Sequence, residues 1–242
     1  MLNQRNLLRF AFLLLLTAPL LLGGAGAPVP AKSIKLFNGK NLNGFYTWVE
    51  TRGRNQDPDG VFTVHDGMVH VSGAKFGYFA TEAEYENYRL TAEFKWGEKT
   101  YAPREGKARD SGILYHFVGP DKIWPKSIEF QIIEGGTGDI ILVDGASLTV
   151  GGVPRTEGRM DRAGKGAWED VAGYRDPAGE VENPRGEWNR LELVVDGDSV
   201  KYFVNGKLVN EGTGAEPHRG KILFQSEGAE IFFRNIKLEK LK

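Results

Sequence analysis

Carboxylate, amide and imidazole side chains gather in one stretch, RDSGILYHFVGPDKIWPKSIEFQIIE, which spans residues 109–134. Alternating apolar residues predict two short strands here, at about 111–117 and 127–134, joined by a Gly-Pro loop. Because side chains of a strand alternate between its faces, Glu129 and Gln131 share one face of the second strand. Ionisable groups on a face where a purely structural sheet would carry apolar residues indicate a binding or catalytic surface.

Glu134 ends this segment, and regular alternation would place its carboxylate on the apolar face of Ile128 and Ile132. A β-bulge at Ile132 or Ile133 would turn Glu134 toward the face of Glu129 instead. Bulges are common beside active sites, where they re-aim side chains. We therefore predict a bulge in the second strand.

The composition is that of a globular protein, with 242 residues, 40% hydrophobic and 26% charged. Residues 1–27 are typical of a signal peptide: two arginines precede an apolar run at 10–22, and Ala-Gly-Ala at 25–27 offers a cleavage site. A retained N-terminal anchor is the alternative. We expect an exported protein, periplasmic or extracellular, with a tether at 28–33 and one domain at 34–242.

The chain has no cysteine, four histidines and a net charge of −1. Stability in an oxidising compartment must then come from a substantial core. The near-neutral charge, without a basic block, argues against nucleic-acid binding, and the mature chain contains no run long enough to span a membrane. No Cys/His metal spacing is present and the sequence requires no cofactor. Structural calcium is compatible with such folds, although Asp57-Pro58-Asp59 and Asp196-Gly197-Asp198 are more simply turns.

Period-two alternation recurs along the chain, and apolar residues at helical spacing are absent beyond the leader. Asx-Gly and similar turn pairs separate the alternating runs, as in hairpins. We expect a long strand at 85–96, hairpins at 61–71, 140–150 and 221–238, and a meander at 188–210. This pattern predicts an all-β jelly-roll sandwich of two curved antiparallel sheets with one concave face. A glycine-rich and charged insertion at about 135–186 is expected to lie over that face.

Several segments together resemble the 3-keto-disaccharide hydrolase family, long catalogued only as a bacterial domain of unknown function. They are LFNGKNLNGFYTW, RDSGILYHF, EFQIIE, GEWNRLELVVDGDSVKYFVNGKLV and GKILFQSEGAEIFFRNIKLEKL. The resemblance spans nearly all of the mature chain. It implies a concanavalin-like fold, an exported bacterial protein and hydrolysis of glycosides oxidised at C3. The chain departs from the family at Asp110, where members usually carry Asn, and at Glu134, where they often carry Asp.

A ketone at C3 makes the C2 proton of a sugar removable, because the resulting carbanion is delocalised as an enolate. Departure of the C1 substituent is then an elimination, and water adds afterwards. This chemistry needs a base near C2 and an acid near the glycosidic oxygen. The sequence hypothesis makes Glu129 or His116 the base and Glu134 the acid. Structural salt bridges of the two glutamates, and a histidine satisfied within the sheet, are the alternatives.

Four further residues are candidates for substrate binding. Arg109 or Lys126 would donate to the enolate oxygen, although either could be a plain surface charge. Gln131 would orient a sugar hydroxyl. Trp124, in the loop between the two strands, could stack on a sugar face.

Two other functions fit the sequence. Glu129-x-Gln131-x-x-Glu134 resembles the Glu-x-Asp-x-x-Glu signature of glycoside hydrolase family 16, with Gln in place of the central Asp. A retaining mechanism of that kind would use the first Glu as nucleophile and the last as acid/base. A non-catalytic carbohydrate-binding or cell-surface interaction module is the remaining alternative.

Overall fold

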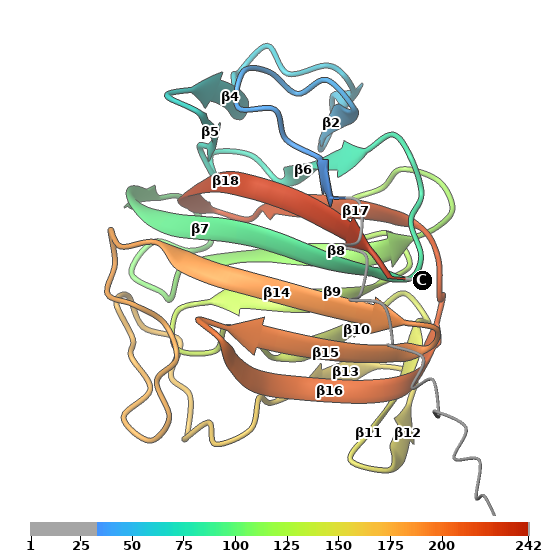
Figure 1. Ribbon diagram of the computed structural model, residues 1–242. Helices are drawn as coiled ribbons and strands as arrows, with labels where there is room; N and C mark the ends of the chain where they lie inside the picture. The colour runs from blue at the N-terminus through green and yellow to red at the C-terminus, as the bar shows by residue number, and fades with distance from the viewer. Residues whose placement is uncertain (1–32, 242) are drawn as a thin grey trace, which may run out of the picture. The chain divides into compact units, whose positions relative to one another are not determined.

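The computed structural model of the protein describes residues 33–241, and every regular element in that range is a strand (Figure 1). The predicted leader and most of the tether lie outside these residues, so export stays a prediction. Within the described range, no helix is long and apolar enough to cross a membrane.

Two antiparallel sheets form the sandwich that the sequence predicts. The larger sheet has ten strands and its long central members face the viewer in Figure 1. Its order is β12 (Val153–Arg155), β11 (Ser147–Val150), β16 (Lys207–Glu216), β15 (Ser199–Val204), β14 (Asn189–Asp196), β7 (Tyr88–Thr100), β18 (Ala229–Lys240), β5 (Met68–Val71) and β4 (Phe62–His65), with β1 (Ser33–Lys35) paired to β18.

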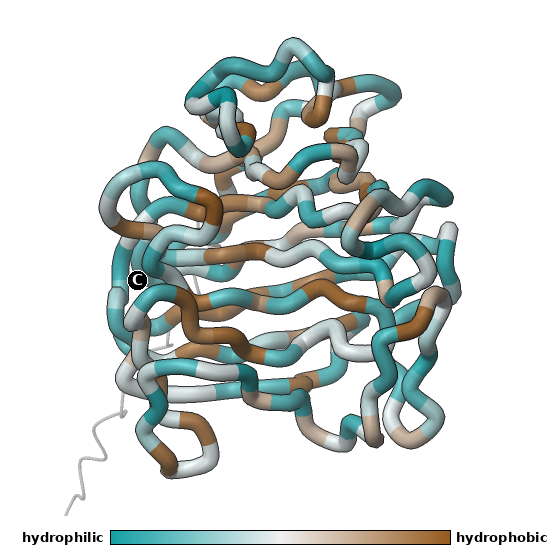
Figure 2. The backbone as a smooth tube through the Cα atoms, turned by 180° about the vertical axis from the view of Figure 1, so that it is seen from behind, coloured by the Kyte–Doolittle hydropathy of each residue, from teal (hydrophilic) through white to brown (hydrophobic). Residues whose placement is uncertain are grey.

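The second sheet has eight strands and carries the segment that the sequence singles out. Its order is β13 (Gly158–Met160), β10 (Ile140–Val143), β9 (Ser127–Ile133), β8 (Asp110–Phe117), β17 (Lys221–Ser226), β6 (Gly77–Thr81), β2 (Phe45–Val49) and β3 (Gly53–Arg54). Figure 2 views the molecule from behind, and hydrophobic and hydrophilic stretches are interleaved along the strands there.

Aromatic side chains fill the space between the sheets. The ring of Phe79 stacks on Phe224 with centroids 4.7 Å apart, and the ring of Phe130 stacks on Tyr202 with centroids 4.2 Å apart. The Tyr202 hydroxyl donates to the Tyr115 hydroxyl across the sandwich at 2.9 Å. A buried aromatic core of this kind removes a large apolar area from water, which supports a fold without disulfides.

The hairpin at 61–71 is confirmed, since β4 pairs with β5 around Asp66-Gly67. The other two predicted hairpins are wrong, although their strands exist. β10 pairs with β9 and β13, whereas β11 pairs with β12 and β16 in the other sheet. Likewise β17 pairs with β6 and β8, whereas β18 pairs with strands of the larger sheet. The Asp144-Gly145 and Glu227-Gly228 turns therefore carry the chain from one sheet to the other.

Candidate active site

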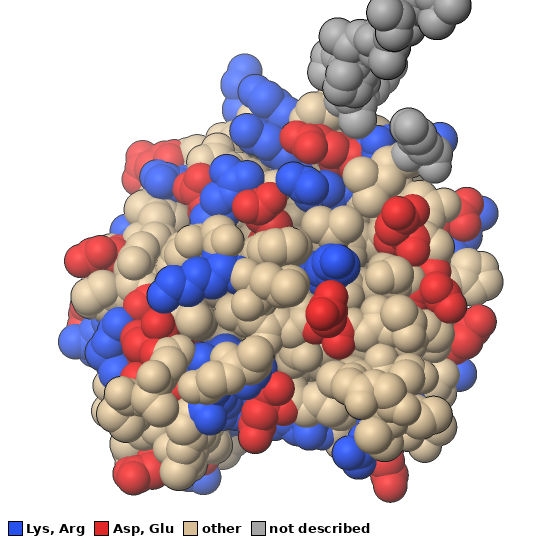
Figure 3. All heavy atoms as spheres, turned by 60° about the horizontal axis from the view of Figure 1, so that its bottom comes forward, with Lys and Arg blue, Asp and Glu red and all other residues tan. Residues whose placement is uncertain are grey.

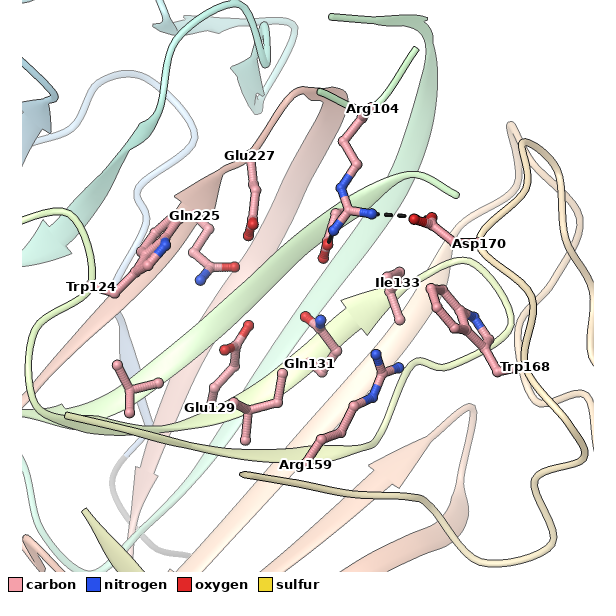
Figure 4. A pocket seen from close by; sticks show the side chains of 13 residues that line it. Arg104, Trp124, Glu129, Gln131, Ile133, Arg159, Trp168, Asp170, Gln225 and Glu227 are labelled. Atoms are coloured by element: carbon pink, nitrogen blue, oxygen red, sulfur yellow. Dashed lines mark hydrogen bonds and ion pairs between the residues drawn. The ribbon is translucent and has the colours of Figure 1, made fainter. Parts of the chain in front are cut away.

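A cleft of about 400 Å³ lies over the outer face of the eight-stranded sheet (Figure 4). Along the strands that form its floor, side chains that face the core alternate with side chains that line the cleft. The floor comes from β8, β9, β10 and the end of β17: Asp110, Glu129, Gln131, Ile133, Ile141, Val143, Gln225 and Glu227. Its walls are loop residues: Arg104, Trp124, Arg159, Trp168 and Asp170.

The bulge predicted in β9 is absent. β9 pairs with β8 in continuous register from Tyr115↔Ile128 to Asp110↔Ile133. Glu129, Gln131 and Ile133 consequently line the cleft, and Ile132 belongs to the core. Continuing the alternation places Glu134 on the core side, where it does not line the cleft.

Glu134 forms a buried ion pair with Arg109, 2.9 Å between Oε1 and Nη1. Its other oxygen accepts the backbone N–H groups of Arg109 at 3.0 Å and of Gly173 at 2.9 Å. Arg109 also donates to the carbonyls of Gly97 and Glu98. This network lines a separate pocket at one end of the sandwich, beside Trp96. Glu134 and Arg109 thus hold loops together and are apart from Glu129.

A bulge does occur one strand away, at His116. Lys221 pairs with Phe117 and Ile222 pairs with Tyr115, so His116 is the extra residue in β8 and has a φ of +57°. The bulge turns His116 inward, against the rings of Tyr88 and Tyr115. Burial lowers the pKa of His116 to about 4, although a hydrogen bond between Nδ1 and the Pro217 carbonyl oxygen at 2.8 Å opposes the shift. His116 therefore lies in the core, outside the cleft.

The two remaining binding candidates differ. Trp124 lines the cleft, and its ring lies 6.2 Å from that of Phe76. Lys126 is half-buried before β9 and does not line the cleft; its carbonyl accepts the Val118 N–H. Of the seven residues predicted for the site, Glu129, Gln131 and Trp124 meet in the cleft.

Glu129 lies at the centre of the floor, 5% exposed. Burial raises its pKa well above the usual range, and the nearby Glu227 carboxyl raises it further. The Arg159 charge and a hydrogen bond with the Gln225 side chain act in the opposite direction. Gly112 makes room for this arrangement, because a Cβ there would lie 2.2 Å from Glu129 Oε1 and 2.6 Å from Gln225 Oε1.

Glu227 is the second carboxyl of the cleft. Burial raises its pKa to about 7, while Arg104 acts to lower it. Among the described residues, neither Glu227 nor Glu129 has an ion-pair partner within 4.0 Å. Sites that transfer protons commonly contain two carboxyl groups that face one cleft and whose charges are not neutralised by an ion-pair partner.

Comparisons with known proteins identify the family and the fold. The family model of the 3-keto-α-glucoside-1,2-lyase-like domain matches residues 32–239. The chain belongs to this family. Among curated proteins, none matches the chain in sequence.

Solved structures share the fold of this 3-keto-α-glucoside-1,2-lyase-like domain. A candidate glycosyl hydrolase from Parabacteroides distasonis has a TM-score of 0.58 at 22% identity, over 87% of this chain and 94% of its own. A Bacillus licheniformis β-glucanase has a TM-score of 0.51 at 11% identity, over 89% and 100%. LamAcat from Zobellia galactanivorans has a TM-score of 0.52 at 10% identity, over 88% and 98%. Family and fold support a glycoside hydrolase-like or carbohydrate-binding function.

Sequence reasoning missed Gln225 and Glu227 because it treated Glu227-Gly228 as a hairpin turn. A signal was present: KILFQSE repeats the Ile-x-Phe-Gln pattern of SIEFQII. In both strands the Phe faces the core and the Gln faces the cleft. Period two then places Glu227 on the face of Gln225.

The walls of the cleft in this lyase-like domain are built from charged loops. Arg104 pairs with the buried Asp110 and, at 3.2 Å, with Asp170. Arg159 lies over the Trp168 ring, 5.0 Å from its centroid, and the Trp168 indole N–H donates to the Glu134 carbonyl at 2.9 Å. Arg159, Trp168 and Asp170 all belong to the 135–186 segment, which borders the cleft.

No group of three or more acidic, His or Cys side chains among residues 33–241 has the arrangement of a metal site. On the face that Figure 3 presents, basic and acidic side chains are interspersed, without a large field of one sign.

Proposed function

We propose that the protein cleaves glycosides oxidised at C3, by proton abstraction at C2, elimination of the C1 substituent and addition of water. The observation that supports this most strongly is the pair of carboxyl groups, Glu129 and Glu227, that face one cleft with raised pKa values. The name of the matching family describes a lyase that acts across C1 and C2, which is the elimination half of this reaction.

The difference in burial between the two carboxyl groups supports an assignment of the two roles. Glu227, with a pKa of about 7, is ionised in a large share of molecules near neutral pH and can act as the base. Glu129 is buried more completely, and burial raises its pKa well above the usual range, which favours the protonated form that an acid needs. The sequence hypothesis makes Glu129 or His116 the base and Glu134 the acid. The position of Glu134 on the other side of the sheet favours the new assignment.

In the first step Glu227 takes the C2 proton, and the electron pair of the C–H bond delocalises onto the C3 oxygen as an enolate. N–H donors that border Glu129, from Gln131 and Arg159, stabilise the developing charge (Figure 4). The electron pair then forms the C1–C2 double bond while the C1–O bond breaks, and Glu129 gives its proton to the departing oxygen. Water adds to C1 of the resulting enone, and C2 regains a proton, so that the free 3-keto sugar forms.

Deuterium exchange separates this reaction from direct displacement at C1. The protein is incubated in D₂O with a 3-keto-glucoside in each anomeric form and with the unoxidised glucosides. We expect alcohol release only from the oxidised compounds, with deuterium at C2 of the sugar product. Release from the unoxidised glucosides without deuterium at C2 would contradict the proposal and support a family-16-like retaining mechanism. Binding without any release would support the carbohydrate-binding module.

A further inference from the structure

Two oxygen acceptors in the cleft lack donors. Asp110 Oδ1 and Gln225 Oε1 are buried and have no hydrogen-bond partner within the described part of the protein, and both side chains line the cleft. Each of the two residues is only 2% exposed. Glu129 lies beside Gln225 Oε1, so the carboxyl proton of Glu129 can supply the donor for that oxygen. A buried acceptor without a donor is costly, so Asp110 Oδ1 calls for a ligand that supplies one.

The surroundings hold Asp110 in place. Arg104 binds the other carboxylate oxygen of Asp110 and also donates to Asp170 at 3.2 Å. The Ala108 N–H donates to the same Asp170 oxygen at 3.2 Å. Asp110 Oδ1 is therefore a fixed, charged acceptor. A hydroxyl group is the donor that a sugar provides, and a charged partner strengthens that hydrogen bond.

The position of Asp110 relative to Glu129 matches the size of one sugar ring. The Glu129 carboxyl lies beside Gly112, and Asp110 lies two residues before Gly112, at the start of β8. Two strand residues span roughly 6.6 Å, comparable with the width of a pyranose ring. Glu227 follows β17 at the same end of the cleft as Arg104 (Figure 4).

The opposite end of the cleft is apolar. Trp124 belongs to the loop that joins β8 to β9, so it lies beyond Glu129 in the direction away from Asp110. Val143 lines the same end, and Figure 4 shows Trp124 far from Arg104 and Trp168. An aromatic ring and an aliphatic side chain suit the flat face of an aryl group or of a second sugar.

We propose that the cleft binds its substrate in one direction, with a hydroxyl at C4 or C6 of the oxidised ring on Asp110 and the leaving group against Trp124. The glycosidic oxygen then lies beside Glu129. Asp110 acts as a specificity-determining residue, and the Trp124 end selects glycosides whose leaving group has an apolar face. This inference rests on the proposed function for its chemistry, but the binding direction can be tested without turnover.

The first experiment pairs Asp110→Ala with 4-deoxy and 6-deoxy versions of the oxidised glucoside. For the parent substrate we expect kcat/KM of the variant to fall roughly a hundredfold or more, because a site built around a hydroxyl rejects its absence strongly. With the deoxy compound that lacks the bound hydroxyl, wild type and variant should differ by less than threefold. An equal loss with every compound would overturn the assignment. The wild type alone repeats the test, since one deoxy compound must be a far poorer substrate than the other.

The second experiment pairs Trp124→Ala with phenyl and methyl leaving groups. We expect KM to rise roughly tenfold for the phenyl glycoside and to change little for the methyl glycoside. Trp188→Ala is the matched control, because it removes a half-buried indole that directly precedes β14 of the other sheet. Equal effects of Trp124→Ala on both compounds would contradict the proposed direction.

Calorimetric measurement of the binding of the same compounds distinguishes a failure of the proposed function from a failure of the proposed binding direction. If no compound is turned over, the proposed function fails. The binding direction still predicts weaker binding of one deoxy compound to the wild type and no such difference for Asp110→Ala. If turnover occurs but this difference is absent, the function stands and the direction fails.

Discussion

Two glutamates on one strand segment, Glu129 and Glu134, have opposite surroundings. Glu134 accepts hydrogen bonds from a guanidinium and two backbone N–H groups, which leaves little capacity for a ligand. Glu129 has no ion-pair partner in the described chain, and its pKa is raised. Regular alternation along β9 sends one to the cleft and the other toward the core side. Residue type alone therefore does not identify a catalytic acid; the number of donors already engaged is what distinguishes the two.

Replacing the cleft carboxyl that is proposed as the base gives the largest expected effect. For Glu227→Gln we expect kcat/KM to fall about 10²–10⁴-fold, the range for loss of a general base. In the wild type, kcat/KM should rise with pH through about 7, because the base must be ionised. The residual activity of Glu227→Gln should lack this rise. A pH profile that keeps the rise in the variant would assign it to another group.

Replacing the carboxyl on the core side should affect stability. For Glu134→Ala we expect the free energy of unfolding to fall by about 3–5 kcal/mol, because Arg109 remains as a buried charge without its partner. Chemical denaturation measures the change. The double replacement Arg109→Met with Glu134→Leu removes both charges and should recover part of the loss. A loss below about 1 kcal/mol in the single variant would show that the pair contributes little to the fold.

His116 in the core and the carboxyl groups in the cleft should affect the pH dependence of stability in opposite directions. Its pKa is lowered from 6.5 to about 4, so below pH 6.5 the unfolded chain binds a proton that the folded protein does not yet bind. Stability should therefore fall as pH decreases from 6.5 toward 4, by up to about 3 kcal/mol. Glu129 and Glu227 act in the opposite direction, because raised carboxyl pKa values destabilise the fold as pH increases above about 4.5. Denaturation of His116→Asn at pH 7 and pH 4.5 should show a smaller loss at acid pH than the wild type.

The smallest expected effect concerns the space beside Glu129. In Gly112→Ala, the new Cβ would displace the Glu129 carboxyl and the Gln225 amide. We expect kcat/KM to fall roughly tenfold to a hundredfold, since a displacement of about 1 Å can have that effect. Gly119→Ala is the control for a glycine replacement away from the cleft: no atom lies within 4 Å of the added methyl, although the φ of +87° adds backbone strain there. Equal activity of the two variants would show that the tight approach to Gly112 is unimportant.

The sequence predicted the strands better than their partners. Alternation located β8, β9, β10 and β17 within a residue or so, because it reports which side chains face the core. The turns at Asp144-Gly145 and Glu227-Gly228 were assigned to hairpins because turn chemistry is local. Whether the next strand pairs with its neighbour or joins the other sheet depends on distant segments.

The candidate site was predicted in part for the same reason. Glu129, Gln131 and Trp124 belong to one contiguous stretch, and their alternation and loop position were visible in the sequence. Glu227 comes from a strand about a hundred residues later, which pairs with β8 only in the folded protein. The bulge was expected beside Glu134 and occurs at His116, because a bulge depends on the register with the neighbouring strand.

The most direct test compares Glu129→Gln with Glu134→Gln in turnover of a 3-keto-glucoside, below the melting temperatures of both variants. If the unpaired cleft carboxyl carries the chemistry, Glu129→Gln loses at least a hundredfold in kcat/KM. Glu134→Gln, folded at that temperature, stays within tenfold of the wild type. A Glu129→Gln variant with full turnover, or a Glu134→Gln variant that loses more than Glu129→Gln, would contradict the account.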